Sequence, residues 1–349
     1  MNIKKMTIKK INLMEVCGTH TMAIARFGLK KLFPKELTML SGPGCPVCVT
    51  PEEDINLAIE ISKRKDVIIT TFGDMVKVPG TFSSLEKEKS NGADIRIIYS
   101  PIDALDIAAA NPNKKIIFLG VGFETTSPSI AMTVKIAKKK KISNFYVLPM
   151  LKTIPNALEA ILQTKNRKID GFLLPGHVSA IIGAKAYKFI AEKYKIPCVI
   201  AGFEAKDILD SIKMLVDQIK NKKPKVEIQY SSVVNNEGNI NAQKVLDDVF
   251  VENDSNWRGI GIIPKSGLKF KSEYKDFDAS KIFQLEARYF KKQSGCDCGK
   301  ILLGIKNPKQ CFLFAKKCTP SNPIGPCMVS SEGACAAEYR YGRTLELEN

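Results

Sequence analysis

The chain has 349 residues, 44% of them hydrophobic, and a formal net charge of +17 at pH 7. This length predicts two or three domains, and no run reaches the roughly 18 apolar residues that would cross a bilayer. The charge would suit nucleic acid, but the cations are spread along the chain without a recognisable nucleic-acid-binding module. A solvated surface is therefore the favoured interpretation, and an acidic protein or an anionic substrate stays open as a partner.

The N-terminal segment 1–16 is basic but has neither a continuous apolar core nor a small-residue cleavage site, so we expect no signal peptide and a cytoplasmic location. The chain has ten cysteines, and six of them fall between Cys296 and Cys335. In a reducing compartment such crowding indicates metal or redox chemistry rather than structural disulfides.

Between residues 37 and 265 the chain alternates short β-rich runs with amphipathic segments. The expected strands are Leu37–Leu40, Val67–Thr71, Ile95–Tyr99, Ile116–Gly120, Tyr146–Pro149, Gly171–Pro175, Cys198–Ala201, Val226–Tyr230 and Gly259–Pro264. The expected helices include Glu52–Lys63, Ser127–Lys139, Asn156–Gln163, Ser179–Lys193 and Ala205–Lys220. Strands alternating with helices predict βαβ units and parallel sheets covered by helices on both faces.

The fold class predicted is therefore α/β, with two similar parallel-sheet domains and a small irregular C-terminal region. The spacing places the domains at residues 30–115 and 116–225. Residues 226–280 are interpreted as a segment that could return to the first domain. The tail, residues 281–349, is rich in Cys, Gly and Pro, and segments of this kind usually need a metal or cross-links to hold a fold. We group residues 1–29 with it.

Polar side chains and glycines follow four of the expected strands. The four strand exits are Thr70–Asp74, Gly120–Thr126, Pro175–Ser179 and Ala201–Glu204. Ligands bind beyond the carboxyl ends of strands in open α/β sheets, so the four together predict one shared cleft that holds Glu124, His177 and Glu204. Taken singly, each exit is as well explained as a turn and helix cap. Both histidines are expected in loops rather than in the core.

The tail cysteines form a series with long spacings. They are Cys296, Cys298, Cys311, Cys318, Cys327 and Cys335. Thiolates favour iron–sulfur clusters and zinc, and these long spacings suit a 4Fe-4S cluster wrapped by a loop. The alternative is a zinc-stapled tail, although structural zinc sites more typically contain C-x2-C pairs, which this series lacks.

A second motif, Gly42–Cys48, contains a C-x-x-C at a strand exit, ahead of the helix expected from Glu52. We interpret Cys45 and Cys48 as a redox dithiol whose thiol pKa is lowered by the helix N-terminus. The flanking Gly-Pro-Gly favours exposed thiols. Two alternatives stay open: the pair could supply two of the ligands of a metal site, or it could be a turn without chemical function.

A third motif, Glu15–Thr21, contains a cysteine, Cys17, and a histidine three residues on. Cys17 is a candidate nucleophile or metal ligand, and His20 could tune the thiol or carry a proton. By contrast, Cys198 lies in an apolar strand and fits the role of a small buried side chain. The sequence has no P-loop and no GxSxG elbow, and Gly120–Gly122 lacks the third glycine of a dinucleotide fingerprint.

Five motifs together give the sequence a family resemblance. They are Cys17–Thr21, Gly42–Cys48, Gly122–Thr126, Pro175–Ser179 and Gly325–Cys335. In this order, over residues 15–342, the chain resembles the HypD family, which takes part in the maturation of NiFe hydrogenases. The resemblance implies two similar α/β domains and a third region that carries a 4Fe-4S cluster.

The resemblance also implies partners and site residues. Members of the family pair with the small chaperone HypC, and the Fe(CN)2CO group is assembled on the complex with cyanide from HypE and HypF. Cys17 would bind that iron together with a HypC cysteine, and Cys45 and Cys48 would be the redox pair. The cluster spacing associated with the family, C-x12-C-x6-C-x16-C, fits Cys298, Cys311, Cys318 and Cys335. Cys296 and Cys327 are then spare.

Within this picture we hypothesise that the cluster reduces the Cys45–Cys48 pair, which in turn poises the iron at Cys17. Glu124, His177 and Glu204 would supply protons or orient cyanide, and His20 would do so beside the iron. Whether this counts as an enzyme or as an assembly factor is left open. One rival is a stand-alone iron–sulfur thiol-disulfide reductase, and another is a zinc-stapled binding scaffold.

Overall fold

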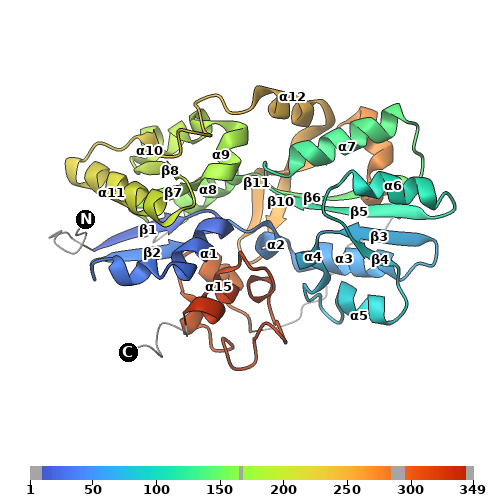
Figure 1. Ribbon diagram of the computed structural model, residues 1–349, viewed down its shortest axis with the longest axis horizontal. Helices are drawn as coiled ribbons and strands as arrows, with labels where there is room; N and C mark the ends of the chain where they lie inside the picture. Colours follow the sequence, from blue (N-terminus) through green and yellow to red (C-terminus); the bar gives the residue numbers. More distant parts are fainter. Residues whose placement is uncertain (1–9, 165–167, 284–294, 343–349) are drawn as a thin grey trace. The chain divides into compact units, whose positions relative to one another are not determined.

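The computed structural model describes residues 10–164, 168–283 and 295–342. The chain divides into two compact units (Figure 1). The first unit comprises Met1–Cys48, Ile154–Ile240 and Gly295–Asn349, and the second comprises Val49–Thr153 and Asn241–Ser294. Each unit is built on its own parallel sheet, which confirms the α/β class.

The first unit contains a five-stranded sheet in the order β2-β1-β7-β8-β9, with every neighbouring pair parallel. The strands are β1 (Ile11–Glu15), β2 (Leu37–Ser41), β7 (Gly171–Pro175), β8 (Cys198–Ala201) and β9 (Val226–Ile228). The central strands β7 and β8 are buried at every position. Burial on both faces explains why their sequences are continuously apolar rather than alternating.

Helices and short 3-10 turns cover this sheet. They are α1 (Gly18–Arg26), η2 (Leu29–Leu32), α2 (Pro46–Val49), α8 (Ile154–Gln163), α9 (Gly176–Ile182), η3 (Ala184–Tyr187), α10 (Lys188–Tyr194) and α11 (Ala205–Asn221). α11 shows the pattern most plainly, because Ile208, Ile212 and Leu215 recur at helical spacing and are fully buried against Leu173 and Val199. Its apolar stripe and the sheet form one core.

The second unit contains a four-stranded parallel sheet in the order β4-β3-β5-β6 and an antiparallel hairpin. The strands are β3 (Val67–Thr71), β4 (Ile95–Ile97), β5 (Lys115–Gly122), β6 (Phe145–Leu151), β10 (Phe250–Trp257) and β11 (Gly261–Phe270). The helices and the 3-10 turn are α3 (Glu52–Ser62), α4 (Gly73–Val76), α5 (Leu85–Ser90), α6 (Asp103–Ala110), α7 (Ser127–Lys139), α12 (Ile240–Val249), η4 (Ser272–Phe277) and α13 (Ala279–Ile282). Phe118, Val134 and Val147 lie in one core with Phe250 and Leu268 of the hairpin.

The two sheets are not divided where the sequence placed the domain boundary. That boundary, between residues 115 and 116, falls inside β5, which pairs with β3 on one side and β6 on the other. Within the expected returning segment 226–280, β9 belongs to the first unit, whereas β10 and β11 belong to the second. Local alternation reveals which segments are strands, but sheet partners depend on contacts between distant segments that alternation does not encode.

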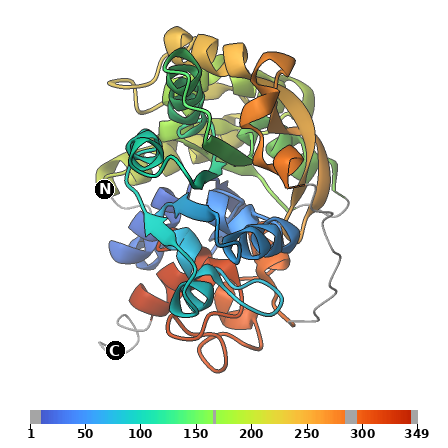
Figure 2. The ribbon, with the colours of Figure 1, turned by 90° about the vertical axis from the view of Figure 1, so that its right-hand side faces the viewer.

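The tail packs on the N-terminal part of the first unit. It contains α14 (Cys298–Leu302), η5 (Pro308–Gln310), η6 (Pro326–Met328) and α15 (Ala334–Tyr341). In Figure 1 and Figure 2 it lies beside α1, where Lys30 pairs with Glu338 at 3.2 Å. The grouping of residues 1–29 with the tail therefore holds for α1, but not for β1, which is a strand of the main sheet that the sequence reading did not anticipate.

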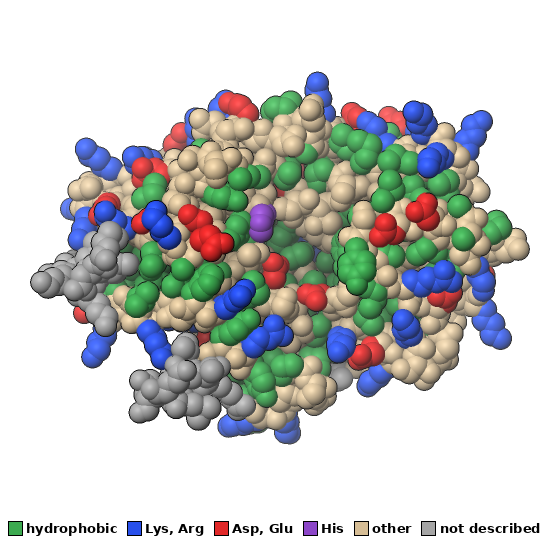
Figure 3. Space-filling view, viewed as in Figure 1, with side chains coloured by type: hydrophobic (Ala, Val, Ile, Leu, Met, Phe, Trp, Pro, Cys, Tyr) green, Lys and Arg blue, Asp and Glu red, His purple; other side chains and the backbone are tan. Residues whose placement is uncertain are grey.

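Surface charge agrees with the solvated-surface interpretation. On the face drawn in Figure 3, lysine and arginine side chains are scattered among acidic and neutral ones and do not gather into one patch. Among the helices described, none is long and apolar enough to span a membrane.

The second-unit core predicts a measurable loss of stability. Phe118 is fully buried and meets Phe72 edge to face, with 5.5 Å between ring centroids. We expect Phe118→Ala to lower the free energy of unfolding by about 3–5 kcal/mol, because it removes buried apolar surface and leaves a cavity. Urea unfolding followed by fluorescence measures this, since Trp257, in the second unit, is the chain's single tryptophan. Lys139→Ala, an exposed change in α7, is the control and should stay within about 0.5 kcal/mol.

Candidate functional site: a row of buried thiols

Cys17 lies where β1 ends and α1 begins. It is the extended residue that precedes the first turn of α1, and the backbone N–H groups of Thr19 and His20 lie near its thiol. Burial raises the pKa of Cys17 to about 12, and the charge of Glu332 adds to this effect. The amides favour a thiolate while burial disfavours it, so ionisation needs a nearby cation.

Glycines allow three segments to meet at this thiol. A Cβ on Gly44 would lie 2.3 Å from the backbone nitrogen of Cys17, and one on Gly18 would lie 2.4 Å from the Cβ of Glu332. The N–H of Gly18 donates to the carbonyl of Gly44 at 3.0 Å. The Cys17 loop, the dithiol loop and the tail are therefore in direct backbone contact.

The dithiol differs from the sequence expectation in exposure. Cys45 is 3% exposed and Cys48 is 0% exposed, whereas exposed thiols were expected. The N–H of Cys48 donates to the sulfur of Cys45 at 3.2 Å. Burial raises the pKa of the Cys48 thiol well above its usual value. The expected lowering by a helix N-terminus is therefore wrong for Cys48, which lies within the one-turn helix α2 rather than ahead of α3.

The tail supplies the next thiols. The thiol of Cys327 lies close to that of Cys48, and the thiol of Cys298 lies close to that of Cys327. The thiol of Cys298 lies 3.1 Å from that of Cys296. The dithiol of the N-terminal segment thus continues into a second pair of thiols, Cys298 and Cys327, without an intervening residue of another kind.

A further group of tail thiols lies beside this row. Burial raises the pKa of Cys335, and the charges of Cys296, Cys318 and Cys311 raise it further, so these four thiols are neighbours. Among the residues described, no three side chains of His, Cys, Asp or Glu converge closely enough to hold a single metal ion. Thiols that are near one another but do not converge on a point can each bind a different iron of a cluster.

His20 lies in the core rather than in a loop. It is within α1, is 0% exposed, and its Nε2 lies 2.9 Å from the carbonyl oxygen of Gly202. Burial lowers its pKa to about 4, so the ring is neutral and donates from Nε2 to that carbonyl. Its Nδ1 is buried and has no partner among the described residues. The sequence expectation of a loop histidine is wrong here, because the motif itself forms the first turn of a helix.

His177 is the exposed counterpart of His20. It lies in the first turn of α9 and stacks on Phe203, with ring centroids 3.9 Å apart. Phe203 also stacks on His20, at 4.8 Å. Partial burial lowers the pKa of His177. Phe203, which follows β8, therefore contacts two of the predicted residues: His20, in the helix after β1, and His177, in the helix after β7.

The two acidic candidates, Glu204 and Glu124, make no ring contact in this aromatic stack. Glu204 is exposed and forms a capping box with Asp207 at the start of α11, which is the turn-and-cap role weighed above. Glu124 follows β5 in the second unit and is 4% exposed. Of the four strand exits, Pro175–Ser179 and Ala201–Glu204 thus lie in the first unit, and Thr70–Asp74 and Gly120–Thr126 lie in the second.

Two functional candidates escaped the sequence reading. Glu15 is 2% exposed, and its carboxylate accepts the N–H of Cys17 at 3.1 Å and the hydroxyl of Thr21 at 2.5 Å. Burial raises the pKa of Glu15 to about 8. Glu332 accepts the hydroxyl of Thr19 at 2.7 Å. For Glu15 the sequence did hold a signal, an acid that ends an apolar strand.

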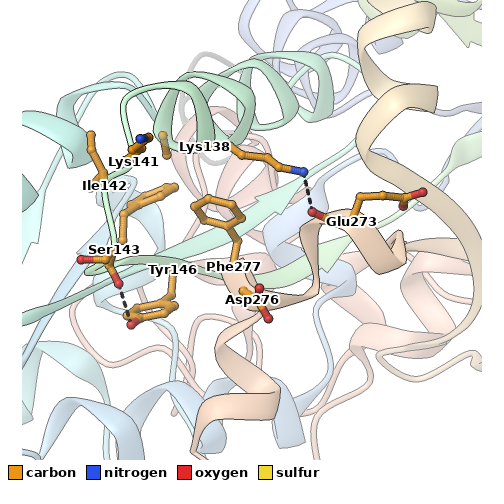
Figure 4. A pocket seen from close by; sticks show the side chains of 10 residues that line it. Lys138, Lys141, Ile142, Ser143, Tyr146, Glu273, Asp276 and Phe277 are labelled. Carbon is orange, nitrogen blue, oxygen red and sulfur yellow. Dashed lines mark hydrogen bonds between the residues drawn. The ribbon is translucent and has the colours of Figure 1, made fainter.

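A surface pocket in the second unit holds none of the predicted residues. Its volume is about 430 Å³, and it lies between the end of α7, β6 and η4 (Figure 4). There Lys138 donates to the backbone carbonyl of Glu273 at 2.8 Å, and Tyr146 donates to that of Ser143 at 2.9 Å. The polar groups of Lys138 and Tyr146 in this pocket are therefore already hydrogen-bonded to the backbone.

Comparison with known proteins gives a consistent result. A family model named HypD, described as "Hydrogenase formation hypA family", matches residues 1–342. Hydrogenase maturation factor HypD of Escherichia coli is 46% identical over 334 residues, 95% of this chain and 90% of that protein. Hydrogenase maturation factor HypD2 of Bradyrhizobium diazoefficiens is 45% identical over 343 residues, 96% and 90%. The HypD protein of Cupriavidus necator is 43% identical over 347 residues, 97% and 92%.

The contrast between the two histidines can be tested directly. The chain has two histidines, so a proton NMR titration yields two imidazole signals, and His177→Gln assigns them. We expect the His177 signal to titrate somewhat below the ordinary pKa, and the His20 signal to stay unprotonated until pH approaches about 4.

The same pKa predicts a pH dependence of stability. Between pH 6.5 and 4 the unfolded chain binds a proton at His20 that the folded chain does not, so stability falls as pH falls through this window. The contribution of His20 is on the order of 3 kcal/mol. His20→Gln should remove it, and a variant with an unchanged pH profile would contradict the buried, neutral ring.

Proposed function

Because the chain belongs to the HypD family of hydrogenase maturation factors, we propose that it acts in NiFe-hydrogenase maturation, as the scaffold on which the Fe(CN)2CO group is assembled. The partner is a small HypC-type chaperone, and cyanide arrives from a HypE-type donor. One observation carries the proposal. Cys17 lies at a strand exit where the dithiol loop and the cysteine-rich tail meet it through Gly18 and Gly44.

In this proposal Cys17 anchors the iron that is the cargo of the reaction, together with a cysteine of the chaperone. The backbone amides of Thr19 and His20 would support the thiolate, and the ferrous cation would offset the burial that raises its pKa. His20 is neutral, and its Nδ1 can accept a hydrogen bond from a group beside the iron; a proton would reside there only briefly, because burial lowers the pKa of the ring to about 4. A thiolate is a suitable ligand for soft, low-spin iron.

Three further residues keep roles in the proposal. His177 presents its exposed ring at the aromatic stack and could orient cyanide. Glu124 and Glu204 would supply protons, although the capping box gives Glu204 a structural role that accounts for its position equally well.

The tail thiols fit a 4Fe-4S cluster. Four neighbouring cysteines form a donor set of the right chemistry, and burial raises the pKa values of two of them, Cys318 and Cys335. The sequence reading chose Cys298, Cys311, Cys318 and Cys335. We propose Cys296 in place of Cys298, because the thiol of Cys296 lies near both Cys335 and Cys318. Cys298 also lies near Cys335, but its nearest thiols are Cys296, at 3.1 Å, and Cys327. When bound, such a cluster supplies single electrons at low potential.

The remaining thiols carry a two-electron exchange between themselves. If Cys45 and Cys48 form a disulfide, a thiolate of the neighbouring Cys298–Cys327 pair attacks Cys48 and forms a mixed disulfide. The second thiol of that pair then closes a Cys298–Cys327 disulfide and releases Cys45 and Cys48 as a dithiol. Two electrons and two protons thus pass from one pair to the other. The contact between Cys48 and Cys327 supports this order.

Thiol burial weighs against the rival function. A stand-alone reductase must present its dithiol to another protein's disulfide, whereas Cys45 and Cys48 are 3% and 0% exposed. Ten cysteines without a disulfide between them suit a reducing compartment, and we propose that the protein works in the cytoplasm. We assign no role to nucleic acid or to a membrane.

The cluster ligands can be tested by substitution. Anaerobically purified wild-type protein should show a broad thiolate-to-iron band near about 400 nm that bleaches on reduction, and about four iron atoms per chain. Cys296→Ala should lose the band and the iron, and Cys298→Ala should keep both. Cys198→Ala, a buried thiol of β8 outside the row, is the matched control. A colourless, zinc-loaded protein would refute the cluster, and a cluster that survives Cys296→Ala but not Cys298→Ala would restore the set chosen from sequence.

The assembly role can be tested in the complex with the HypC-type partner. Infrared spectra should show cyanide and carbonyl bands for wild type and Cys198→Ala, and none for Cys17→Ser. We expect Cys45→Ser to bind the partner but to carry no diatomic ligands, since it lacks the dithiol. If Cys45→Ser still loaded the partner with Fe(CN)2CO, the dithiol step would be wrong while the scaffold role would stand.

A further inference from the structure

A buried lysine lies at the carboxyl end of the second sheet. Lys152 directly follows β6 and is 2% exposed. Its ammonium donates to the hydroxyl of Ser255 on β10 at 2.5 Å, and its backbone N–H donates to Gly122 at 3.0 Å. An ammonium has three donors, and Ser255 is the one acceptor that the described residues give it. Lysine is almost never this deeply buried without a paired charge or a functional reason.

Arg258 brings a second cation to the same region. It lies in the turn that joins β10 to β11, three residues after Ser255. Its Nε donates to the carbonyl of Thr50 at 2.8 Å, and its backbone N–H donates to that of Val49 at 2.8 Å. Its Nη2 is buried and has no hydrogen-bond acceptor within the described part of the chain. These bonds fix the guanidinium group and leave one of its arms unsatisfied.

Asp54, in the first turn of α3, links the two cations. Burial raises the pKa of the Asp54 carboxyl group to about 6, and the neighbouring Glu53 adds to this effect. The positive charges of Lys152 and Arg258 partly oppose it, because they favour the carboxylate. Both cations therefore act on the same carboxyl group. Among the described residues Asp54 accepts no hydrogen bond from either of them. We call Lys152, Arg258, Asp54, Ser255 and Thr50 the Lys152 cluster.

The cluster contains donors without acceptors: Lys152 is buried with one acceptor, and the Nη2 of the partly exposed Arg258 is itself buried without one among the described residues. Trp257 is fully buried beside it and stacks on Phe123, with ring centroids 6.0 Å apart. The indole N–H of Trp257 is already satisfied by Ser266 at 2.7 Å, so it does not compete for a ligand. Buried donors without acceptors cost free energy, and the carboxyl end of a parallel sheet is where ligands bind in such folds.

We propose that the Lys152 cluster is a binding site for a small monovalent anion, held between the ammonium group of Lys152 and the free Nη2 of Arg258. Such an anion supplies the missing acceptors to both cations at once. The site is independent of the thiols, because all of its residues belong to the second unit. Carboxylates and other small anions share this chemistry, so the nature of the anion is a matter for the test.

The test is thermal unfolding of the full-length protein with sodium formate, bicarbonate or thiocyanate, each against sodium gluconate at equal concentration. Gluconate is too large for the site and controls for ionic strength. At least one small anion should raise the unfolding midpoint by about 2–4 °C near saturation, because it binds the folded state alone. Trp257 fluorescence follows the unit that holds the site.

Two variants locate the effect. Lys152→Met keeps the apolar stem and removes the charge, and Arg258→Lys keeps the charge but cannot reach Thr50 and the anion together. Both should lose the shift. Lys269→Met, an exposed lysine of β11, should keep it.

Calorimetric titration of wild-type protein with the same three salts gives a readout that depends on no variant. A site filled by water predicts no heat and no shift for any of them, and that result would overturn the proposal. A shift that persists in Lys152→Met and Arg258→Lys would overturn it as well, since the anion would then bind elsewhere.

Discussion

Desolvation of sulfur is the constraint on which the site of this protein depends. Nine of the ten cysteines are buried, and Cys296 is partly exposed. Burial raises the pKa of a thiol because the anion loses its hydration, and the pKa values of Cys17, Cys48 and Cys335 are all raised for this reason first. A buried thiolate is then stable where a cation or a covalent bond to another sulfur takes the place of water. The proposed function meets this need in three ways. Iron stabilises the thiolate of Cys17, a cluster stabilises those of the tail, and the paired thiols form covalent bonds with one another.

The same constraint explains the glycines. Thiols can be buried beside one another when the backbones that carry them approach closely, and a Cβ at Gly44 or Gly18 would collide with the neighbouring loop. A Cβ on Gly325 would lie 2.6 Å from the sulfurs of both Cys296 and Cys298. The glycines of the motifs are thus requirements of packing around sulfur rather than of turn conformation, since none of these three has a positive φ.

Sequence reasoning performed well where local pattern decides the outcome. α7 spans Ser127–Lys139 and β7 spans Gly171–Pro175, as their periodicity and composition predict. It was less successful where contacts between segments far apart in the sequence determine the structure. β1 is short, follows a basic segment and ends in Glu15, yet it lies between β2 and β7 because both neighbours offer it a parallel ladder. Burial of the Cys45–Cys48 dithiol could not be predicted from the local sequence either, because the tail that covers it comes some 250 residues later.

The choice between Cys296 and Cys298 shows why spacing alone fails at the site. A single residue, Asp297, separates them, and either could complete a series with Cys311, Cys318 and Cys335. In the structure their surroundings differ. Cys298 lies between Cys296, at 3.1 Å, and Cys327, which is close to Cys48. Cys296 lies near both Cys335 and Cys318.

The chain runs directly from the dithiol into the second unit, and this connection gives the Lys152 cluster a structural consequence. α2 ends at Val49, one residue after Cys48, and Arg258 donates to the carbonyls of both Val49 and Thr50. Those carbonyls would otherwise end the helix without partners. Arg258 thus fixes the chain just beyond the dithiol, and its Nη2 lacks an acceptor among the described residues. Occupancy of that nitrogen therefore bears on how firmly the chain at Val49 and Thr50 is held.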